Sequence, residues 1–451
     1  MIQMRLSEAA NILSAGLIGD DVHFRGCSTD TRTLTKGSLF IALRGDNYDG
    51  HDFIDDAFRE GAAAALVERE LSDIDQPLIV VDNSKGAMGD LASAWRSNFT
   101  MPVIAVTGSN GKSTVKEMLA SILSQEDEVL STEGNLNNDI GVPLTLFRLN
   151  DDHKFAVIEM GANHPGEISK LTQLTSPDIA LITLCAPAHI EGFGSIEGVA
   201  NAKAEIFSGL SENGVAIINA DDSYADLWIE KVADKKRLTF GISDSADVSV
   251  RDLKMNEETG QTEFTLTTAC AQVVVKLNLA GLHNVHNALS AAACCIALNI
   301  PLSQISKGLQ LVEAVKGRLQ TKSGLNGSRI IDDTYNANPA SMDAAIKMLT
   351  ETSKRSWLVM GDMGELGDIA EDAHQQAGCN ARTSGVERLY AIGELSRHAV
   401  DAFGNDAKHF ENKESLIAAL IPEIKNDLSV LVKGSRAMQM EKVVQSLVEE
   451  D

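Results

Sequence analysis

The chain of 451 residues lacks the features that would place it in a membrane, on nucleic acid or outside the cell. It has no run of eighteen apolar residues, and its start has neither the basic segment nor the apolar stretch of a secretion signal. It also has few basic residues: 39 against 64 acidic ones, a net charge of −25. A surface this negative repels phosphate backbones and anionic lipid, so we expect no nucleic-acid partner and no membrane insertion. A small anionic substrate would need a locally basic pocket.

The six cysteines show no CxxC or metal-ligand spacing, which argues against a disulfide framework or a zinc site. Cys294 and Cys295 lie in an alanine-rich helical run, where we expect buried, unreactive thiols. This pattern is typical of a reducing compartment, and we expect a cytoplasmic protein. The sequence also lacks repeats, low-complexity tracts and Pro/Gly-rich linkers, although its length predicts two or three domains.

Hydrophobic periodicity predicts an α/β protein with three blocks, at residues 1–83, 84–313 and 314–451. The first block has short strand-like runs at 39–43, 63–67 and 78–81. The second has continuous apolar runs at 102–107, 155–160, 179–184 and 215–219, as buried parallel strands do, followed by an alternating pattern at 247–279 that predicts appended antiparallel strands. The third alternates strands at 329–331, 357–360, 389–392 and 429–432 with helices, and ends in a helical stripe containing Met440 and Leu447.

A glycine-rich turn between a strand and a helix is the strongest local signal: Gly108, Ser109, Asn110, Gly111, Lys112, Ser113 and Thr114. The glycines let backbone N–H groups face phosphate oxygens at a helix N-terminus, Lys112 can reach the terminal phosphates, and Ser113 can offer its hydroxyl to Mg²⁺. In the usual Walker spacing the first glycine would stand at Val106. The loop is therefore two residues shorter, which excludes an ordinary motor ATPase or GTPase.

A carboxylate and an imidazole follow two strands of the same predicted sheet. Glu159 ends the run at 155–160, and His189 follows the run at 179–184. Ligands of parallel α/β sheets bind beyond the carboxyl ends of the strands, so both side chains should lie beside the phosphate loop. Each alone is more readily a hydrogen-bonding group, but together with Lys112 they predict a Mg²⁺ site.

Other polar segments have both a structural and a functional interpretation. Lys203 by itself would be a surface lysine, and Asn284 suits a helix cap. Asp332, Asp333 and Asn336 follow a strand, where turns and caps also favour Asp and Asn. The segment from Lys433 to Arg436 places two cations at an expected helix start, which suits a carboxylate ligand.

Taken together, these segments resemble the Mur ligase superfamily along the whole chain. The motifs that carry the resemblance are STDTRTLTKGSLFIALRGDNYDGHDF, TGSNGKST, TEGNLNNDIGVPLTL, GLHNVHNALSAA, VKGRLQ, DDTYNANPASM, GDMGELG and LVKGSRAM. Within the superfamily they are most similar to the member that adds D-alanyl-D-alanine to UDP-MurNAc-tripeptide. The resemblance implies a small N-terminal α/β domain for the UDP substrate (1–83), a central ATP- and Mg²⁺-binding domain (84–313) and a Rossmann-like C-terminal domain for the incoming dipeptide (314–451).

The implied reaction is an ATP-dependent ligation through an acyl phosphate in peptidoglycan precursor synthesis, with the domains rotating to close around small-molecule substrates; we expect a monomer. The implied catalytic residues are Lys112, Glu159, His189 and Lys203, and a carbamylated Lys203 would join Ser113, Glu159 and His189 as a metal ligand. The implied ATP contacts beyond the phosphate loop are Asn287, Arg318 and Asp333, or its neighbour Asp332. The implied UDP-substrate contacts are Ser28, Thr29, Asp49, His51, Asn135, Asn137, Asn138 and Asp139. Asn336, Lys433 and Arg436 are the candidates for the dipeptide.

Three other interpretations remain at the level of the sequence. A sister ligase could add a single amino acid to the same kind of precursor, but its aspartate-asparagine-proline-arginine signature is absent. A folate glutamate ligase would not need the N-terminal UDP-type motifs. A non-catalytic nucleotide-binding regulator would keep the phosphate loop but lose residues such as Glu159, His189 and Asp333, all of which are present.

Overall fold

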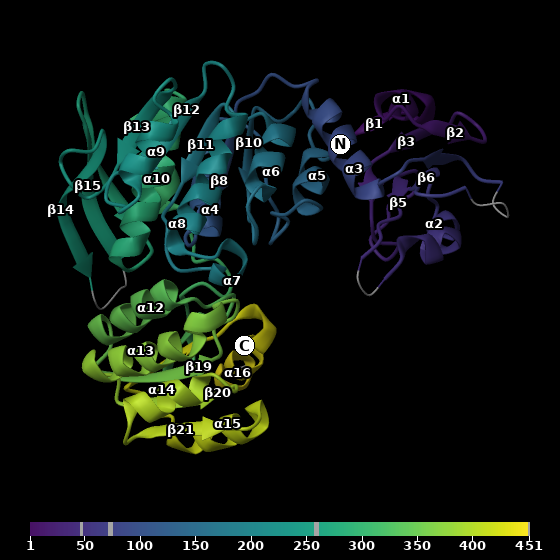
Figure 1. The fold of residues 1–451 in the computed structure, drawn as a ribbon. Helices are drawn as coiled ribbons and strands as arrows, with labels where there is room; N and C mark the ends of the chain where they lie inside the picture. Colours follow the sequence, from purple (N-terminus) through teal and green to yellow (C-terminus); the bar gives the residue numbers. More distant parts are fainter. Residues whose placement is uncertain (46–47, 71–74, 257–260, 450–451) are drawn as a thin grey trace.

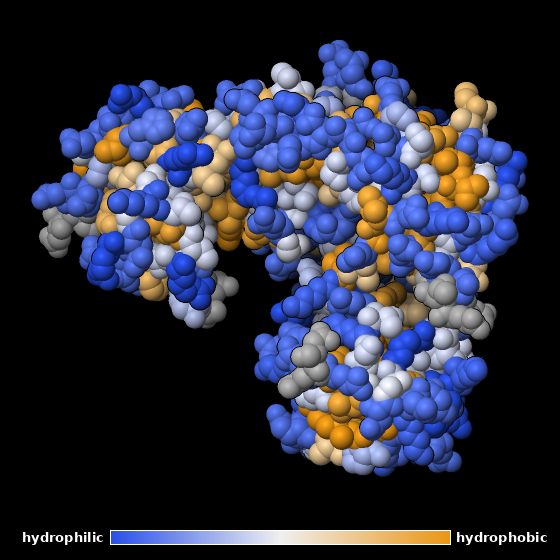
Figure 2. All heavy atoms as spheres, turned by 180° about the vertical axis from the view of Figure 1, so that it is seen from behind, coloured by the Kyte–Doolittle hydropathy of each residue, from blue (hydrophilic) through white to orange (hydrophobic). Residues whose placement is uncertain are grey.

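The computed structural model describes residues 1–45, 48–70, 75–256 and 261–449. Within them the chain forms three α/β units in chain order, drawn in purple, teal, and green to yellow in Figure 1. The central unit joins the other two, and Figure 2 shows a hollow between the N-terminal and C-terminal units. The three predicted blocks thus each contain a separate main sheet.

The N-terminal unit has a five-stranded sheet in the order β2-β7-β6-β5-β4 and a two-stranded antiparallel pair, β1-β3. Its strands are β1 (Gln3–Arg5), β2 (Gly16–Ile18), β3 (His23–Arg25), β4 (Cys27–Ser28), β5 (Leu39–Ile41), β6 (Ala64–Val67) and β7 (Leu78–Val80). Its helices are α1 (Leu6–Ile12), the 3-10 turn η1 (Gly50–Phe53) and α2 (Ile54–Arg59). The next helix, α3 (Ser84–Arg96), shares one apolar core with Phe24 of this unit and Val103 of the next, and so ties the two units together.

The central unit is a nine-stranded sheet in the order β16-β15-β14-β13-β12-β11-β8-β10-β9. Its strands are β8 (Val103–Thr107), β9 (Val129–Ser131), β10 (Phe155–Glu159), β11 (Ile179–Ile182), β12 (Val215–Asn219), β13 (Lys236–Phe240), β14 (Val248–Asn256), β15 (Gln261–Thr268) and β16 (Gln272–Leu277). The strands from β8 to β13 run parallel, whereas β14, β15 and β16 pair antiparallel, as the alternating pattern predicted. The sequence pattern did not predict β9 and β13, because β9 has only three residues and β13 begins with Lys236 and Arg237.

Helices cover both faces of the central sheet, because its parallel strands are apolar on both sides. These helices are α4 (Lys112–Leu123), α5 (Gly141–Leu146), α6 (Glu167–Thr175), α7 (Ile190–Phe193), α8 (Ile196–Ala204), η2 (Glu205–Gly209), α9 (Ala225–Lys231), α10 (Leu282–Ala297) and α11 (Leu302–Gln310). Ile104 and Val106 of β8 face the core with α4 and α10, while Val103 and Ala105 face the core with α5 and α6. Cys294 and Cys295 are fully buried in α10, and burial raises the pKa of both thiols, as expected of unreactive cysteines.

The C-terminal unit is a six-stranded sheet in the order β17-β18-β22-β19-β20-β21. Its strands are β17 (Gln320–Ser323), β18 (Arg329–Asp333), β19 (Arg355–Gly361), β20 (Arg388–Ile392), β21 (Ala407–Phe410) and β22 (Leu428–Lys433). Its helices are η3 (Leu325–Gly327), α12 (Pro339–Glu351), η4 (Gly367–Ile369), α13 (Ala370–Thr383), α14 (Ser396–Phe403), α15 (Lys413–Leu420), η5 (Ile421–Glu423), η6 (Arg436–Met438) and α16 (Glu441–Leu447). All strands except β17 run parallel, so the unit has the predicted Rossmann-like form.

Two details of the predicted helix starts are wrong. The expected helix after Lys433 is a 3-10 turn, η6, and α16 begins only at Glu441. At α10 the capping position is Gly281, which has no side chain to cap with. Asn284 instead lies buried inside the first turn, where its Nδ2 donates to the Ala280 carbonyl at 2.7 Å.

Candidate functional site

The phosphate loop forms the turn between β8 and α4, where the sequence predicted it. Gly108 has φ +146° and Gly111 has φ +82°, values that side chains disfavour. A Cβ on Gly108 would lie 1.9 Å from Thr183 Oγ1, and one on Gly111 would lie 2.4 Å from Asn287 Oδ1. The backbone conformation and the lack of room for a Cβ therefore both require glycine at these two positions.

The segment that directly follows β11 holds the loop in this shape. Ser109 N–H donates to the Leu184 carbonyl at 2.9 Å, and Ser109 Oγ donates to the Ala186 carbonyl at 3.0 Å. Thr183 Oγ1 donates to the Asn110 carbonyl at 2.6 Å. The backbone and the hydroxyl of Ser109 and the backbone carbonyl of Asn110 thus all have partners within the protein.

The two polar residues that follow the glycines take internal partners. Lys112 Nζ donates to the Gly108 carbonyl at 2.7 Å, and burial lowers its pKa while the Glu159 charge opposes that change. Ser113 is buried, and its Oγ accepts a hydrogen bond from Arg318 Nη2 at 3.0 Å. The Arg318 guanidinium also stacks over the Tyr335 ring, 4.1 Å from its centroid, so Arg318 connects the loop to the C-terminal unit. Thr114 follows in the first turn of α4 and is half-buried.

Glu159 ends β10 and is 1% exposed. Its Oε1 accepts from Asn137 Nδ2 at 2.8 Å, while its Oε2 is buried with no hydrogen-bond partner among the described residues. A buried, unsatisfied oxygen costs roughly 1–3 kcal/mol, and more when it is charged. This atom is therefore a vacant acceptor suited to a cation.

His189 and Glu159 lie on opposite sides of the phosphate loop, because β11 and β10 flank β8 in the sheet. His189 precedes α7 in the left-handed conformation, with φ +53°, and its Nδ1 contacts the Glu365 carboxylate of the C-terminal unit. The hydrogen bond from His189 lowers the pKa of Glu365. His189 is thus engaged in a contact between two units.

Lys203 is not the surface lysine that its sequence alone suggested. It lies on α8 with 1% of its surface exposed, and its Nζ lies 5.4 Å from the centroid of the Phe193 ring. Burial, with the nearby Lys112 charge as the second cause, lowers the pKa of Lys203 to about 7. A large fraction of this amine is neutral at physiological pH, a state in which lysine is nucleophilic.

The ends of β18 and β22 bring another set of predicted residues together. Lys433 is 2% exposed, and its Nζ donates to Asp333 Oδ2 at 2.6 Å and to the Asn336 carbonyl at 2.8 Å. Asp332 points elsewhere and pairs with Lys322 at 2.7 Å. Of the two candidate aspartates, Asp333 therefore faces the other site residues. Arg436 lies apart, 65% exposed, and pairs with Glu441.

The N-terminal part of α10 lies against the phosphate loop. Asn287 is buried beside Gly111 and donates to Asn284 Oδ1 at 3.2 Å. His283 lies near Asp333 and Lys433, and burial lowers its pKa to about 4. His283 stands within the motif GLHNVHNALSAA, but no pattern in the sequence marked it as a site residue.

The residues predicted for the UDP substrate lie in two places. In the N-terminal unit, Ser28 is buried at the end of β4 beside half-buried Thr29. Asp49 binds His51 Nδ1 at 2.5 Å, while His51 Nε2 accepts from the Glu68 N–H at 2.9 Å, so the imidazole already has both nitrogens bonded. The other predicted contacts form the loop before α5. Asn137 bonds Glu159, Asn138 Oδ1 accepts from Gly141 N–H, Asp139 pairs with Lys85, and Asn135 is exposed.

No group of three or more His, Cys, Asp and Glu side chains placed to hold a metal occurs in the described ranges. A magnesium ion at Glu159 would therefore need oxygens from Ser113 or from bound phosphates, which such an ion commonly uses. The unsatisfied Oε2 of Glu159 and the buried Ser113 hydroxyl fit that requirement.

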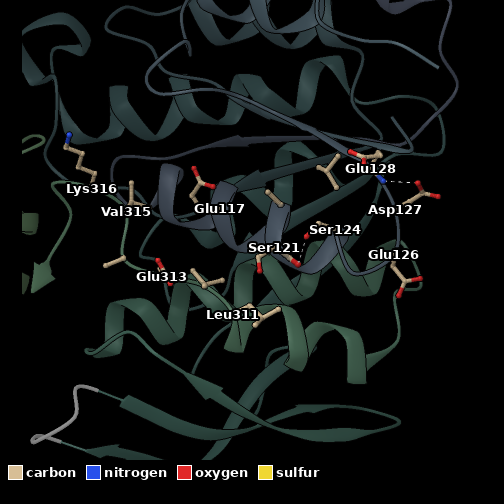
Figure 3. Close-up of a pocket in the computed structure, with 14 residues that line it drawn as sticks. Glu117, Ser121, Ser124, Glu126, Asp127, Glu128, Leu311, Glu313, Val315 and Lys316 are labelled. Carbon is tan, nitrogen blue, oxygen red and sulfur yellow. Dashed lines mark hydrogen bonds between the residues drawn. The ribbon is translucent and has the colours of Figure 1, made fainter. Parts of the chain in front are cut away.

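A cavity of about 850 Å³ lies away from this site, beside α4 and the segment 311–316 that leads to the C-terminal unit. Figure 3 shows its labelled carboxylates, Glu117, Glu126, Asp127, Glu128 and Glu313, around it, with Lys316 as its one labelled cation. Such a lining repels phosphates and carboxylates. This cavity is therefore unsuited to an anionic nucleotide.

A phosphate loop on a central parallel sheet, flanked by two further α/β units, defines a multidomain nucleotide-binding protein. Family models for the Mur ligase family match in three places: the catalytic domain at residues 23–96, the middle domain at 106–295 and the glutamate ligase domain at 317–436. The chain belongs to the Mur ligase family, whose members use ATP.

Relatives match over the full length. The UDP-N-acetylmuramoyl-tripeptide–D-alanyl-D-alanine ligase of Escherichia coli K12 is 45% identical over 100% of this chain and 99% of its own. A crystal structure of MurF from Acinetobacter baumannii is 33% identical, with a TM-score of 0.94 over 100% of both chains. MurF from Thermotoga maritima, solved in complex with ADP, is 27% identical, with a TM-score of 0.81 over 94% of this chain and 96% of its own. In the part of the chain that the structure describes, no helix is long and apolar enough to cross a membrane.

Proposed function

We propose that this chain is the ligase that joins D-alanyl-D-alanine to UDP-MurNAc-tripeptide with hydrolysis of ATP to ADP and phosphate, completing the pentapeptide precursor of peptidoglycan. The observation that carries the proposal is full-length similarity to ligases of that name, up to 45% identical, combined with an intact phosphate loop and Glu159. Similarity extends through the C-terminal unit, where the sister ligases must differ because they take a different amine.

The chemistry requires activation of a carboxylate, which does not acylate amines in water by itself. Attack of the tripeptide's terminal carboxylate on the γ-phosphorus gives an acyl phosphate and ADP. The free amine of the dipeptide then adds to the acyl carbon, and the tetrahedral intermediate expels phosphate while the amine loses a proton. Both steps bring anions together, so cations must dominate the site locally despite the net charge of −25.

The side chains on the central unit suit this task. Lys112 would leave the Gly108 carbonyl to bind the terminal phosphates, with Arg318 beside it. Ser113 and Glu159 would hold Mg²⁺, and His189 would hold a second ion after release from Glu365. The metal would neutralise charge on the transferring phosphoryl group. Asn287 and Asp333 would contact the nucleotide.

Lys203 is proposed to be carbamylated. Its amine, with a pKa of about 7, is neutral often enough to attack CO₂, forming an N–C bond and releasing one proton. The product is a carboxylate, which would neutralise the positive charge of Lys112 and act as a further metal ligand. Mass spectrometry of the protein kept in bicarbonate tests this. A mass that shows only an unmodified amine at Lys203 would argue against carbamylation.

The ranges 1–83, 84–313 and 314–451 are proposed as domains for the UDP substrate, for ATP and for the dipeptide. Ser28, Thr29, Asp49 and His51 would bind the UDP substrate, together with Asn135, Asn137, Asn138 and Asp139. Asn336, Lys433 and Arg436 would bind the dipeptide. The hollow in Figure 2 leaves room for the domains to close, and X-ray scattering with an ATP analogue and the UDP substrate would measure that closure. We propose a monomer in the cytoplasm, where ATP is available and free thiols such as Cys294 stay reduced.

The deciding experiment is phosphate release from ATP with UDP-MurNAc-tripeptide, comparing D-alanyl-D-alanine with single amino acids as acceptors. Release that requires both the precursor and the dipeptide supports the proposal. Release with a single amino acid would move the chain to a sister reaction. No release with any acceptor, in a protein that still binds ATP, would favour a non-catalytic nucleotide-binding protein.

A further inference from the structure

A pair of asparagines joins the phosphate loop to the C-terminal unit. Asn338 Nδ2 donates to Asn110 Oδ1 at 2.8 Å, and Asn110 Nδ2 donates to Asn338 Oδ1 at 3.3 Å. The two residues are 228 positions apart in the chain, and Asn338 is buried. Neither the reaction proposed above nor the roles of the loop glycines and Lys112 use this contact.

Both asparagines are also held by hydrogen bonds within their own units. The backbone carbonyl of Asn110 accepts from Thr183 Oγ1, which holds the residue in place between Gly108 and Gly111 at the tip of the loop. Asn338 caps α12: its Oδ1 accepts from Ser341 N–H at 2.9 Å, and Ser341 Oγ accepts from Asn338 N–H at 3.0 Å. Asn338 Oδ1 therefore accepts from both Ser341 N–H and Asn110, whereas the Asn338 amide nitrogen donates to Asn110.

We propose that this amide pair is a latch through which the seated C-terminal domain positions the phosphate loop, and that Asn338 is a positioning residue for nucleotide binding and phosphoryl transfer. The segment that carries Asn338 also carries Asp333 and Asn336, close to Lys433. A displacement of this segment therefore reaches the loop tip directly. The latch is uncharged, so bound phosphates do not oppose it as they would oppose a carboxylate at the same place. The proposal deepens the ligase function above and rests on it for its catalytic part.

The alternative is that Asn338 is only a helix cap. A cap requires one side-chain oxygen, which Ser also supplies, and it predicts no dependence on Asn110. The variants Asn110→Ala, Asn338→Ala, Asn338→Ser and Asn110→Ala/Asn338→Ala separate the two roles. Asn412 provides the matched control, because it caps α15 in the same domain by accepting from Ser415 N–H at 2.8 Å and lies outside the proposed site.

Two quantities are measured for each variant: the Kd of Mg-ADP by calorimetry, and kcat/KM for ATP in the phosphate-release assay. We expect Asn110→Ala, Asn338→Ala and Asn338→Ser each to raise the Kd of Mg-ADP roughly tenfold and to lower kcat/KM for ATP roughly tenfold. Loss of a hydrogen bond in a closed site has an effect of this size. The double variant should be no worse than either single alanine variant, because all of them remove one contact. Asn412→Ala should lower the melting temperature but leave both quantities unchanged.

Two outcomes overturn the latch. If Asn338→Ser equals wild type in both quantities, Asn338 is only a cap. If the effects of the two alanine variants multiply in the double variant, Asn110 and Asn338 act independently. Failure of the proposed function looks different: wild type would then release no phosphate with dipeptide, while the calorimetric comparison would still decide whether the latch holds the loop.

Discussion

The two sides of the candidate site are prepared in opposite ways. On the central side, Glu159 has an oxygen with no partner in the described chain, and Lys203 is buried without a hydrogen-bonded carboxylate among these residues. On the C-terminal side, Lys433 is neutralised by Asp333 at 2.6 Å, and Arg436 pairs with Glu441 at 3.1 Å. Glu159 on the central side thus has a vacant acceptor, whereas the two cations on the C-terminal side, Lys433 and Arg436, are each paired with a carboxylate.

This difference predicts which substrates are bound first. Buried groups without partners lower stability, and their cost is recovered when a ligand of the right charge arrives. Metal should therefore bind at Glu159 without first displacing a partner of its Oε2, although Lys112 must exchange the Gly108 carbonyl for phosphate. The dipeptide carboxylate must compete with Asp333 or Glu441 for a cation, so it should bind more weakly until the domains close.

Loss of Lys112 should have the largest effect. Lys112→Ala removes the half-buried cation that we propose binds the transferring phosphate, and we expect kcat to fall by at least about 10³-fold. Phosphate release under saturating substrates measures this. Lys307→Ala, at an exposed lysine on α11, is the matched control and should retain full activity. A Lys112 variant with near-normal kcat would mean that the loop binds phosphate through its backbone alone.

Glu159→Gln should have the next largest effect, and metal should partly reverse it. The amide keeps the size of the side chain but removes the charge of the vacant oxygen, so we expect a roughly 100-fold weaker apparent affinity for Mg²⁺. Titration of phosphate release with Mg²⁺ gives that affinity. Glu126→Gln, an exposed carboxylate beside the cavity in Figure 3, should leave the titration unchanged. An unshifted curve for Glu159→Gln would remove Glu159 from the metal site.

Lys203 should make stability depend on pH in a defined direction. Its pKa is about 7 in the folded chain and 10.5 when exposed, so between these values the unfolded chain binds more protons. The free energy of unfolding should therefore rise as the pH increases from about 7 towards 10.5. Below pH 7 the buried ammonium destabilises the folded chain to the full extent. Melting temperatures of wild type and Lys203→Met in CO₂-free buffer test this. We expect wild type to gain several degrees relative to the variant over that range. If the melting temperatures of wild type and Lys203→Met change with pH in parallel, the Lys203 ammonium is solvated in the folded chain.

The sequence predicted the parts of this site that depend on local order. The loop from Gly108 to Thr114 and the position of Glu159 follow from strand, turn and helix signals within about fifty residues. The contacts between domains could not be predicted in this way. The pairing of Asn110 with Asn338, and of His189 with Glu365, depends on how units far apart in the chain are docked.

The burial of individual side chains was the other property that could not be predicted from the sequence. Lys203 looked like a surface lysine in a helical pattern, whereas in the fold it is buried, with the Phe193 ring near its amine. His51 carries the opposite lesson. Its motif marked it for the UDP pocket, yet both of its ring nitrogens are bonded within the N-terminal unit. Only the faces of the His51 imidazole are therefore left to contact a substrate, and a sequence pattern does not describe that geometry.

The smallest expected effect is at Arg436, and it tests the satisfied side of the comparison. Because Arg436 is 65% exposed and its pair with Glu441 lies at the surface, Arg436→Ala should change the free energy of unfolding by less than about 0.5 kcal/mol. If Arg436 binds the dipeptide carboxylate, the KM for D-alanyl-D-alanine should rise while the KM for ATP stays constant. Glu441→Gln is the informative counterpart, since it frees Arg436 and should lower the same KM. If neither variant changes that KM, Arg436 leaves the dipeptide site, and Lys433 with Asn336 must bind the carboxylate after separation from Asp333.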